Sequence, residues 1–242
     1  MTNEIILIAE LVLVYAAVPL IYRFAGKTGL YMWSAIATIL ANIEVLILVR
    51  AFGMEQTLGN ILFASTFLVT DILSEKYGKR EAKIAVNIGI LASFSFLVIS
   101  QLWLLYTPCE SDWAFESFKT LFTQTPRIML VSLLVYALVQ KFDVWAYHKW
   151  WELTEKISGN RKSLLWIRNN GSTLISQLLN TILYTFGAFG SLYDTKTLIN
   201  ICISTYVIYI CTSIADTPAI YIARRMRSRR DSDSEGDENK IG

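Results

Sequence analysis

The chain has 242 residues, of which 54% are apolar and 17% are charged, and its formal net charge is +2. A soluble globular domain is usually about 45–50% apolar and about 25% charged. The composition therefore disfavours a soluble enzyme and a disordered chain. It also disfavours a nucleic-acid-binding protein, because so small a net charge does not attract a polyanion.

The charged residues cluster and leave long uncharged stretches between the clusters. Three of these stretches cover residues 84–106, 169–193 and 197–215. The hydrocarbon core of a bilayer is about 30 Å thick and needs about 20 mostly apolar residues in a helix. Each stretch therefore predicts a transmembrane helix.

Four further apolar segments complete the prediction. They cover residues 5–22, 30–49, 59–73 and 127–141, and the last can extend to residue 145. The first three contain one acidic residue each, namely Glu10, Glu44 and Asp71. The first segment lacks the basic start of a signal peptide, so we expect a retained helix. The fold class is thus expected to be an all-α polytopic membrane protein with seven transmembrane helices in total.

Lysine and arginine alternate between rich and poor along the predicted tails and loops. The second, fourth, sixth and last of these segments are richer in both residues than their neighbours. Because basic residues concentrate in cytoplasmic loops, this pattern places the N-terminus outside and the C-terminus in the cytoplasm. Residues 224–242 are basic and then acidic with few apolar residues, and we expect a disordered cytoplasmic tail.

The cysteine, histidine and glycine patterns do not indicate an enzyme. The chain has three cysteines and one histidine, and it contains no G-x-x-x-x-G-K-[ST] motif. These numbers disfavour a metal centre and a nucleophile–base pair. We therefore expect no catalytic residues, no metal and no cofactor, and any coupling to ATP would need a separate subunit.

The sixth predicted span carries a polar stripe. Asn170, Thr173, Gln177, Asn180 and Tyr184 recur at spacings that place them on one face of a helix. Side-chain amides cannot face lipid without losing their hydrogen bonds, so the stripe faces other helices or a wet cavity. Contacts between helices would explain one or two amides. The larger number found here favours a cavity.

Other spans add polar residues at similar depth. Asn42 and Glu44 lie near the middle of the second span on different faces, at the depth of the middle of the sixth span. These residues complete the predicted substrate-binding set, which comprises Asn42, Glu44, Asn170, Thr173, Gln177, Asn180 and Thr181.

Acidic residues near the predicted cytoplasmic side form a second candidate group. Its members are Asp71, Glu75 and Asp216. For Asp71 and Asp216, one interpretation is a structural pair with a basic residue, for which Lys79, Arg80 and Arg168 are candidates. The other interpretation is a gate or a site for ion coupling, because ionisable residues inside a membrane are usually functional.

The polar groups indicate the chemistry of a ligand. An amide offers a donor and an acceptor together and matches the edge of a nucleobase or lactam. A simple anion would require Arg or Lys near the middle of the membrane, and none is predicted there. A planar, nearly neutral, hydrogen-bonding solute is therefore expected.

Several segments resemble one known family. Residues 63–78, which read FASTFLVTDILSEKYG, look like the signature of the queuosine precursor transporter family, also called the VUT family. Asn42, residues 172–177 (STLISQ), Asn180-Thr181 and residues 216–218 (DTP) are similar to its other blocks, in the same order. The resemblance covers roughly residues 30–223. Asn180 stands where we would expect aspartate in many members.

The resemblance implies a multi-pass transporter in a bacterial inner membrane that imports 7-deazaguanine bases such as preQ0, preQ1 or queuine for tRNA modification. It implies a six-helix core over residues 30–223, likened to the substrate-binding subunits of energy-coupling-factor importers. Residues 1–29 would add an extra N-terminal transmembrane helix and the first cytoplasmic loop. The expected partners are the base and the lipid bilayer, without nucleic acid, and a homodimer is compatible with this picture.

The alternatives are a binding subunit that needs a separate ATPase, and a transporter of another nucleobase-like solute. A non-transporting scaffold with a dry, fully paired bundle is a further alternative.

Overall fold

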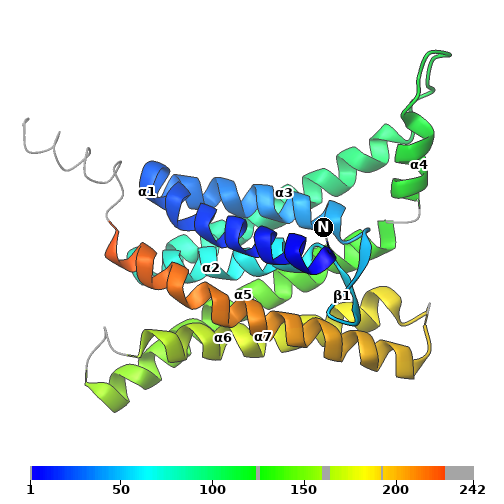
Figure 1. Ribbon diagram of the computed structural model, residues 1–242. Coiled ribbons are helices and arrows are strands. Elements are labelled where there is room, and N and C mark those ends of the chain that lie inside the picture. The colour runs from blue at the N-terminus through cyan, green and yellow to red at the C-terminus, as the bar shows by residue number, and fades with distance from the viewer. Residues whose placement is uncertain (1, 124–125, 160–163, 192, 227–242) are drawn as a thin grey trace, which may run out of the picture.

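The computed structural model describes residues 2–123, 126–159, 164–191 and 193–226, which form a bundle of long helices (Figure 1). Residues 227–242 of the predicted tail lie outside the described residues. The helices are α1 (Asn3–Glu44), α2 (Asn60–Tyr77), α3 (Lys79–Trp103), α4 (Phe115–Thr123), α5 (Pro126–Ser158), α6 (Leu165–Phe189) and α7 (Thr195–Arg225). The strands are β1 (Leu48–Ala51) and β2 (Met54–Thr57).

Helix α1 consists of two halves that fold back on each other at Gly26. The φ and ψ angles of Gly26 are 59° and −147°, a combination open essentially only to glycine. The start of α1 lies beside the chain that follows its end, because Asn3 Nδ2 donates to the Arg50 carbonyl oxygen at 2.9 Å. A straight helix of 42 residues would be about 63 Å long and would keep these ends apart. The two halves therefore account for the first two predicted spans.

The other five predicted spans coincide with α2, α3, α5, α6 and α7 to within a few residues, except that α5 and α7 extend well past the predicted ends. In the described part of the chain, four helices are long and apolar enough to cross a membrane: α1, α3, α5 and α7. Helices α2 and α6 are less apolar because they carry most of the polar residues singled out above. The all-α membrane class predicted from composition is thus confirmed.

The β1–β2 hairpin was not predicted. The strands are antiparallel, with Leu48 opposite Thr57 and Ala51 opposite Met54. Phe52 and Gly53 in the turn both have positive φ angles, of 52° and 73°, as two-residue hairpin turns require. The predicted second span, 30–49, was therefore too long. Helix α1 ends at Glu44, and the apolar residues after it belong to a strand instead.

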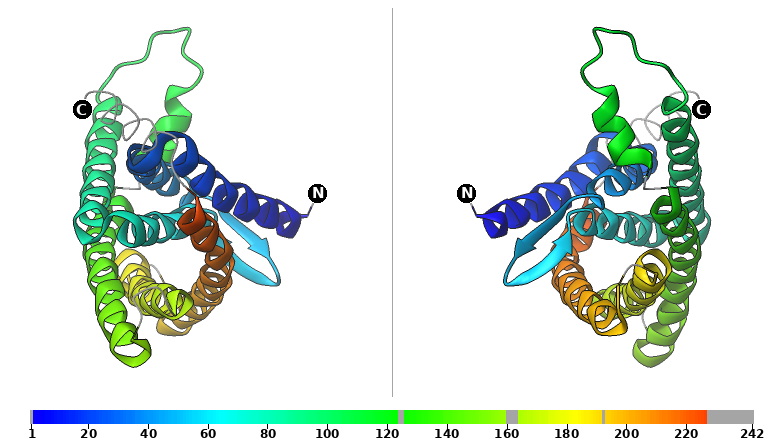
Figure 2. Two further views of the ribbon diagram at one scale, coloured as in Figure 1. Left: turned by 90° about the vertical axis from the view of Figure 1, so that its left-hand side faces the viewer. Right: turned by 90° about the vertical axis from the view of Figure 1, so that its right-hand side faces the viewer.

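Short α4 was also missed, because the sequence predicted only a long loop. Its start is capped by Asp112, whose Oδ1 accepts from the backbone N–H groups of Ala114 at 3.0 Å and Phe115 at 2.7 Å. Phe118 and Phe122 pack their rings against Trp103 at the end of α3. Figure 2 shows α4 and its loop projecting from one corner of the bundle.

Helix α2 is the most enclosed helix, and it packs against α1, α3, α5 and α7. Nearly all its residues from Asn60 to Ser74 are buried. Gly78, with φ of 87°, turns the chain directly into α3. This central position shields the polar groups of α2 from lipid.

Helix α7 starts at a capping aspartate, and this contact is testable. Asp194 Oδ2 accepts from the backbone N–H groups of Lys196 at 3.1 Å and Thr197 at 3.4 Å. The hydrogen bonds from the Thr197 side chain and backbone hold the pKa of Asp194 below its ordinary value. The cap therefore stabilises the fold above the ordinary aspartate pKa and weakens as the pH falls through the lowered pKa.

We expect Asp194→Ala to lower the melting temperature of the purified protein at neutral pH, because the first turn of α7 loses its acceptor. Asp194→Asn should keep most of the stability, since asparagine is an equally good cap. Equal melting temperatures for the wild type and the alanine variant would contradict this role.

Candidate functional site

A cavity with both apolar and polar side chains in its wall lies among α1, α2, α3, α5, α6 and α7 at the end of the bundle that carries the β1–β2 hairpin, called here the hairpin end. Its volume is about 190 Å³. Gln56 of β2, Phe189 at the end of α6 and Thr197 in the first turn of α7 belong to its wall, so the cavity extends to the hairpin end. The polar side chains in this wall count against a dry, fully paired scaffold.

Hydrogen-bonding groups in the cavity are only partly paired. Asn180 Nδ2 donates to the Tyr209 hydroxyl at 3.3 Å, and that hydroxyl donates to Asn60 Oδ1, also at 3.3 Å. Asn60 Nδ2 and the hydroxyls of Tyr136 and Tyr184 are buried without a partner within the described residues. Buried polar groups are rarely left unpaired, so these groups indicate a ligand or water in the cavity.

Aromatic rings form another part of the wall. The ring centre of Phe63 lies 6.0 Å from that of Tyr136 and 6.3 Å from that of Tyr209. On the α1 side, Asn42 Nδ2 donates to the Thr38 carbonyl at 2.8 Å and to Ser93 Oγ at 3.3 Å. Flat apolar faces next to amide groups suit a planar molecule with polar edges.

From the cavity toward the opposite end of the bundle, the side chains on one face of α2 change from aromatic to acidic. Phe63 lines the cavity, Phe67 is fully buried in an apolar layer, and Asp71 and Glu75 follow at intervals of four residues. Residues four apart lie above one another on a helix. The neighbouring helices carry similar series along their length, namely Tyr136, Gln140, Asp143 and Tyr147 on α5, and Tyr209, Ser213, Asp216 and Arg224 on α7.

The lower half of the α6 stripe is paired with other helices. Asn169 Nδ2 donates to Asp216 Oδ1 at 2.7 Å, and Asn170 Nδ2 donates to Thr217 Oγ1 at 2.9 Å. Thr173 Oγ1 donates to Asp71 Oδ2 at 3.3 Å. The stripe therefore has two parts, and this half holds α6 to α7 and α2.

The structure brings only some of the predicted binding residues to the cavity. Asn42, Asn180 and Thr181 line it, whereas Asn170 and Thr173 make the helix contacts just described. Gln177 is almost fully buried below the cavity, with Oε1 unpartnered. Glu44 lies outside the cavity wall, close enough to Glu10 on the other half of α1 for the two carboxyl groups to interact.

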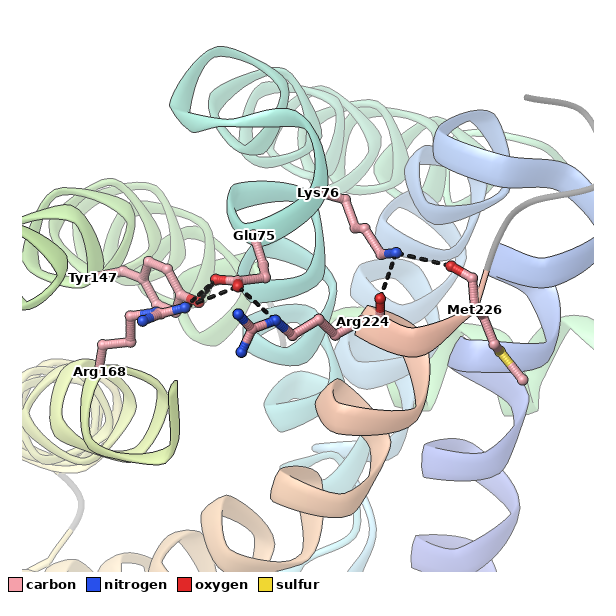
Figure 3. A network of polar contacts seen from close by, with 6 residues as sticks. All are labelled: Glu75, Lys76, Tyr147, Arg168, Arg224 and Met226. Carbon is pink, nitrogen blue, oxygen red and sulfur yellow. Dashed lines mark hydrogen bonds and ion pairs between the residues drawn. The ribbon is translucent and has the colours of Figure 1, made fainter. Parts of the chain in front are cut away.

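A network of ion pairs joins four helices at the opposite end, called here the basic end (Figure 3). Arg168 Nη2 of α6 lies 2.8 and 2.6 Å from the two carboxylate oxygens of Glu75 on α2. Arg224 Nε of α7 lies 3.1 Å from Glu75 Oε1, and the Tyr147 hydroxyl of α5 donates to Oε2 at 3.2 Å.

Two cationic side chains make further contacts around this network. Lys76 Nζ donates to the carbonyl oxygens of Arg224 at 2.7 Å and Met226 at 2.8 Å (Figure 3). The Arg168 guanidinium also lies over the Trp151 ring, 4.5 Å from its centre. The interpretation that Arg168 pairs with Asp71 or Asp216 was therefore wrong in its partner, because Arg168 pairs with Glu75.

The sequence analysis missed several residues of the cavity and of the polar series below it. Asn60, Tyr136 and Tyr209 line the cavity, and Asp143 is fully buried in α5. The helical spacing of Tyr136, Gln140, Asp143 and Tyr147 was a usable signal, because it places polar groups on one face. An aspartate inside a predicted span was another.

The fold and the cavity define a polytopic α-helical membrane protein with an internal polar site. Residues 57–223 match the family described as "Putative vitamin uptake transporter", and the chain belongs to this family. It is similar to the protein named "Probable queuosine precursor transporter" of Bacillus subtilis (strain 168). The two are 37% identical over 212 residues, which are 88% of this chain and 90% of that protein. No solved structure shows a significant match. The family resemblance seen in the sequence is thus confirmed.

Removing the charge of Glu75 tests the ion-pair network. We expect Glu75→Gln to destabilise the protein by about 3–5 kcal/mol, because it leaves the buried Arg168 guanidinium without its counter-charge. The measurement is the melting temperature of purified protein.

Glu152→Gln is the matched control, because Glu152 is exposed and pairs with Lys149 at 2.9 Å within one helix. Such surface pairs contribute little. If both variants melted at the same temperature, the Glu75 network would not be a main contact between the helices.

Proposed function

We propose that the protein is an importer of queuosine precursors, 7-deazaguanine bases such as preQ0, preQ1 or queuine, in a bacterial inner membrane. The observation that carries this proposal is the cavity of unpartnered polar groups and aromatic rings within a chain of an uptake-transporter family. The name of the Bacillus subtilis relative supports the choice of cargo.

The cavity wall fits the chemistry of such a base. A 7-deazaguanine has a flat ring and a guanine-like edge with donors and acceptors, which the amides of Asn42, Asn60 and Asn180 can pair. Phe63 offers an aromatic face. The described part of the wall contains no Lys or Arg, as expected for a base that is neutral or, with an aminomethyl group, cationic.

In this proposal, the structure represents a state that is open on the outer side and closed on the cytoplasmic side. The cavity extends to the hairpin end, whereas the ion pairs of Glu75 join four helices at the basic end. With the N-terminus outside, as the basic residues predict, the hairpin end is extracellular. Release of the base into the cytoplasm then requires these ion pairs to part, which makes Glu75 a gate residue and places Asp71 and Asp216 behind the gate.

The finer architecture belongs to the same proposal. A six-helix core over residues 30–223, likened to energy-coupling-factor binding subunits, would follow an extra helix in residues 1–29. The bend at Gly26 lies close to this boundary, and the family match falls entirely within the core. Stable co-purification with an ATPase would instead favour a binding subunit of a larger importer.

Binding to purified protein tests the site. We expect Asn60→Ala and Asn180→Ala each to weaken queuine binding by about ten- to hundredfold, because each removes an amide that pairs with the edge of the base. Affinity is measured by titration, and queuosine in tRNA is measured in cells that insert the base but cannot make it.

Asn170→Ala is the matched control from the same stripe of α6. Asn170 contacts Thr217 and Ser213 of α7, so its loss should lower the melting temperature without changing the affinity of the folded protein. Full affinity and full tRNA modification in an Asn60→Ala, Asn180→Ala double variant would rule out this cavity as the binding site.

A further inference from the structure

Three aspartates lie buried together between the cavity and the ion pairs of the basic end. Asp71 of α2, Asp143 of α5 and Asp216 of α7 are each exposed by 1% or less. Both Asp143 and Asp216 are close enough to Asp71 to interact electrostatically. Asp143 also interacts with Asp216. The binding function proposed above does not use Asp143.

No basic side chain in the described part of the chain forms an ion pair with these three aspartates. The basic residues of the neighbouring ion-pair network have other partners. Arg168 and Arg224 pair with Glu75, and Lys76 donates hydrogen bonds to backbone carbonyl oxygens. Within the described residues, the hydrogen bonds that reach the aspartates come from Asn169, which donates to Asp216, and Thr173, which donates to Asp71.

The other groups near the aspartates are neutral or negative. Glu75 on α2 is the remaining acidic neighbour, and its charge is held by Arg168 and Arg224. Tyr147 on α5 and Tyr15 on α1 add phenol hydroxyls near Asp71 and Asp216, respectively. A buried carboxylate without a counter-charge is costly, so these groups need a proton or another cation.

A second observation points to protons. Ser176 of α6 is fully buried and faces Asp143, yet in the described part of the chain its hydroxyl forms no hydrogen bond of normal geometry. Among the described residues, both carboxylate oxygens of Asp143 also lack a hydrogen-bond partner. Further unpartnered acceptors on α5 and α6 are Gln140 Oε1, Asn169 Oδ1 and Gln177 Oε1. A neutral aspartic acid carries one O–H donor, which can form a hydrogen bond to one of these acceptors.

We propose that Asp143, assisted by Asp71 and Asp216, carries the proton that drives substrate uptake through this protein. The inference rests on the proposed import function and adds its energy source. The proton comes from outside water through the cavity and binds a carboxylate oxygen of Asp143, which becomes neutral. When the Glu75 ion pairs part, water reaches the aspartates from the cytoplasm, and the same proton leaves as the base is released.

The geometry explains why the two events are linked. On α6, Thr173 next to Asp71 and Asn180 in the cavity are seven residues apart, or about 10 Å. Gln177 lies between them on the same stripe and has a free acceptor. The same helix therefore contacts both the proton site and the base site, and a shift of α6 affects both.

The test uses purified full-length protein in liposomes with radiolabelled queuine. With one coupled proton per molecule of base and no membrane potential, an outside-acidic gradient of one pH unit should give up to about tenfold accumulation. A protonophore should abolish this accumulation. A sodium gradient at equal pH should produce none.

Asp143→Asn mimics the neutral side chain permanently. We expect this variant to lose gradient-driven accumulation while it still binds queuine and exchanges it across the membrane, with a rate that no longer depends on pH. Asp112→Asn is the control, because Asp112 caps α4 outside the bundle and asparagine caps equally well. It should accumulate queuine like the wild type.

The outcomes separate this inference from the proposed function. Wild-type protein that exchanges queuine but does not accumulate it along a proton gradient overturns the inference alone, as does accumulation that follows sodium. Normal accumulation by Asp143→Asn also overturns it. Wild-type protein that neither binds nor exchanges any 7-deazaguanine overturns both. The wild-type measurements decide the question even if Asp143→Asn does not fold.

Discussion

Polar side chains inside a membrane-spanning bundle have to face one another or water, and this constraint sets the arrangement of the whole protein. Helices α2 and α6 carry most of these side chains. Helix α2 is enclosed by four other helices, and the polar stripe of α6 points inward. The apolar residues of α1, α3, α5 and α7 are then left to face lipid, which agrees with their higher hydropathy. The buried pair of Arg168 and Glu75 is the strongest expression of this constraint, because neither charge is stable there alone.

The bundle separates its polar groups by depth. The hairpin end contains unpartnered amides and hydroxyls next to aromatic rings, and the basic end contains the ion pairs of Glu75 with Arg168 and Arg224. Between them lie the fully buried Phe67 and then the aspartates. Unpartnered polar groups at one end and ion pairs between helices at the other are consistent with the outward-open state proposed above.

Much of the fold could be predicted because the bilayer demands long apolar helices, and these are visible in one dimension. Helix boundaries were less predictable where an apolar segment can either extend a transmembrane helix or form a strand. The segment around Leu48 is apolar enough to extend a span, yet it forms a strand because the turn at Phe52 and Gly53 allows a hairpin. Helix α5 continues past the predicted end, and its second half contacts α6, where the Trp151 ring lies against the Arg168 guanidinium.

The sequence by itself determined the membrane class, the approximate positions of the membrane-spanning helices, the family and the existence of a polar face on α6. These features depend on local composition and helical periodicity. Only the tertiary structure decided which half of that face lines a cavity and which half bonds to α7, because identical amides differ only in what lies opposite them. It also decided that Arg168 pairs with Glu75 and that Asp143 joins Asp71 and Asp216. Such partners come from helices far apart in the chain, and their meeting is fixed by packing rather than by spacing.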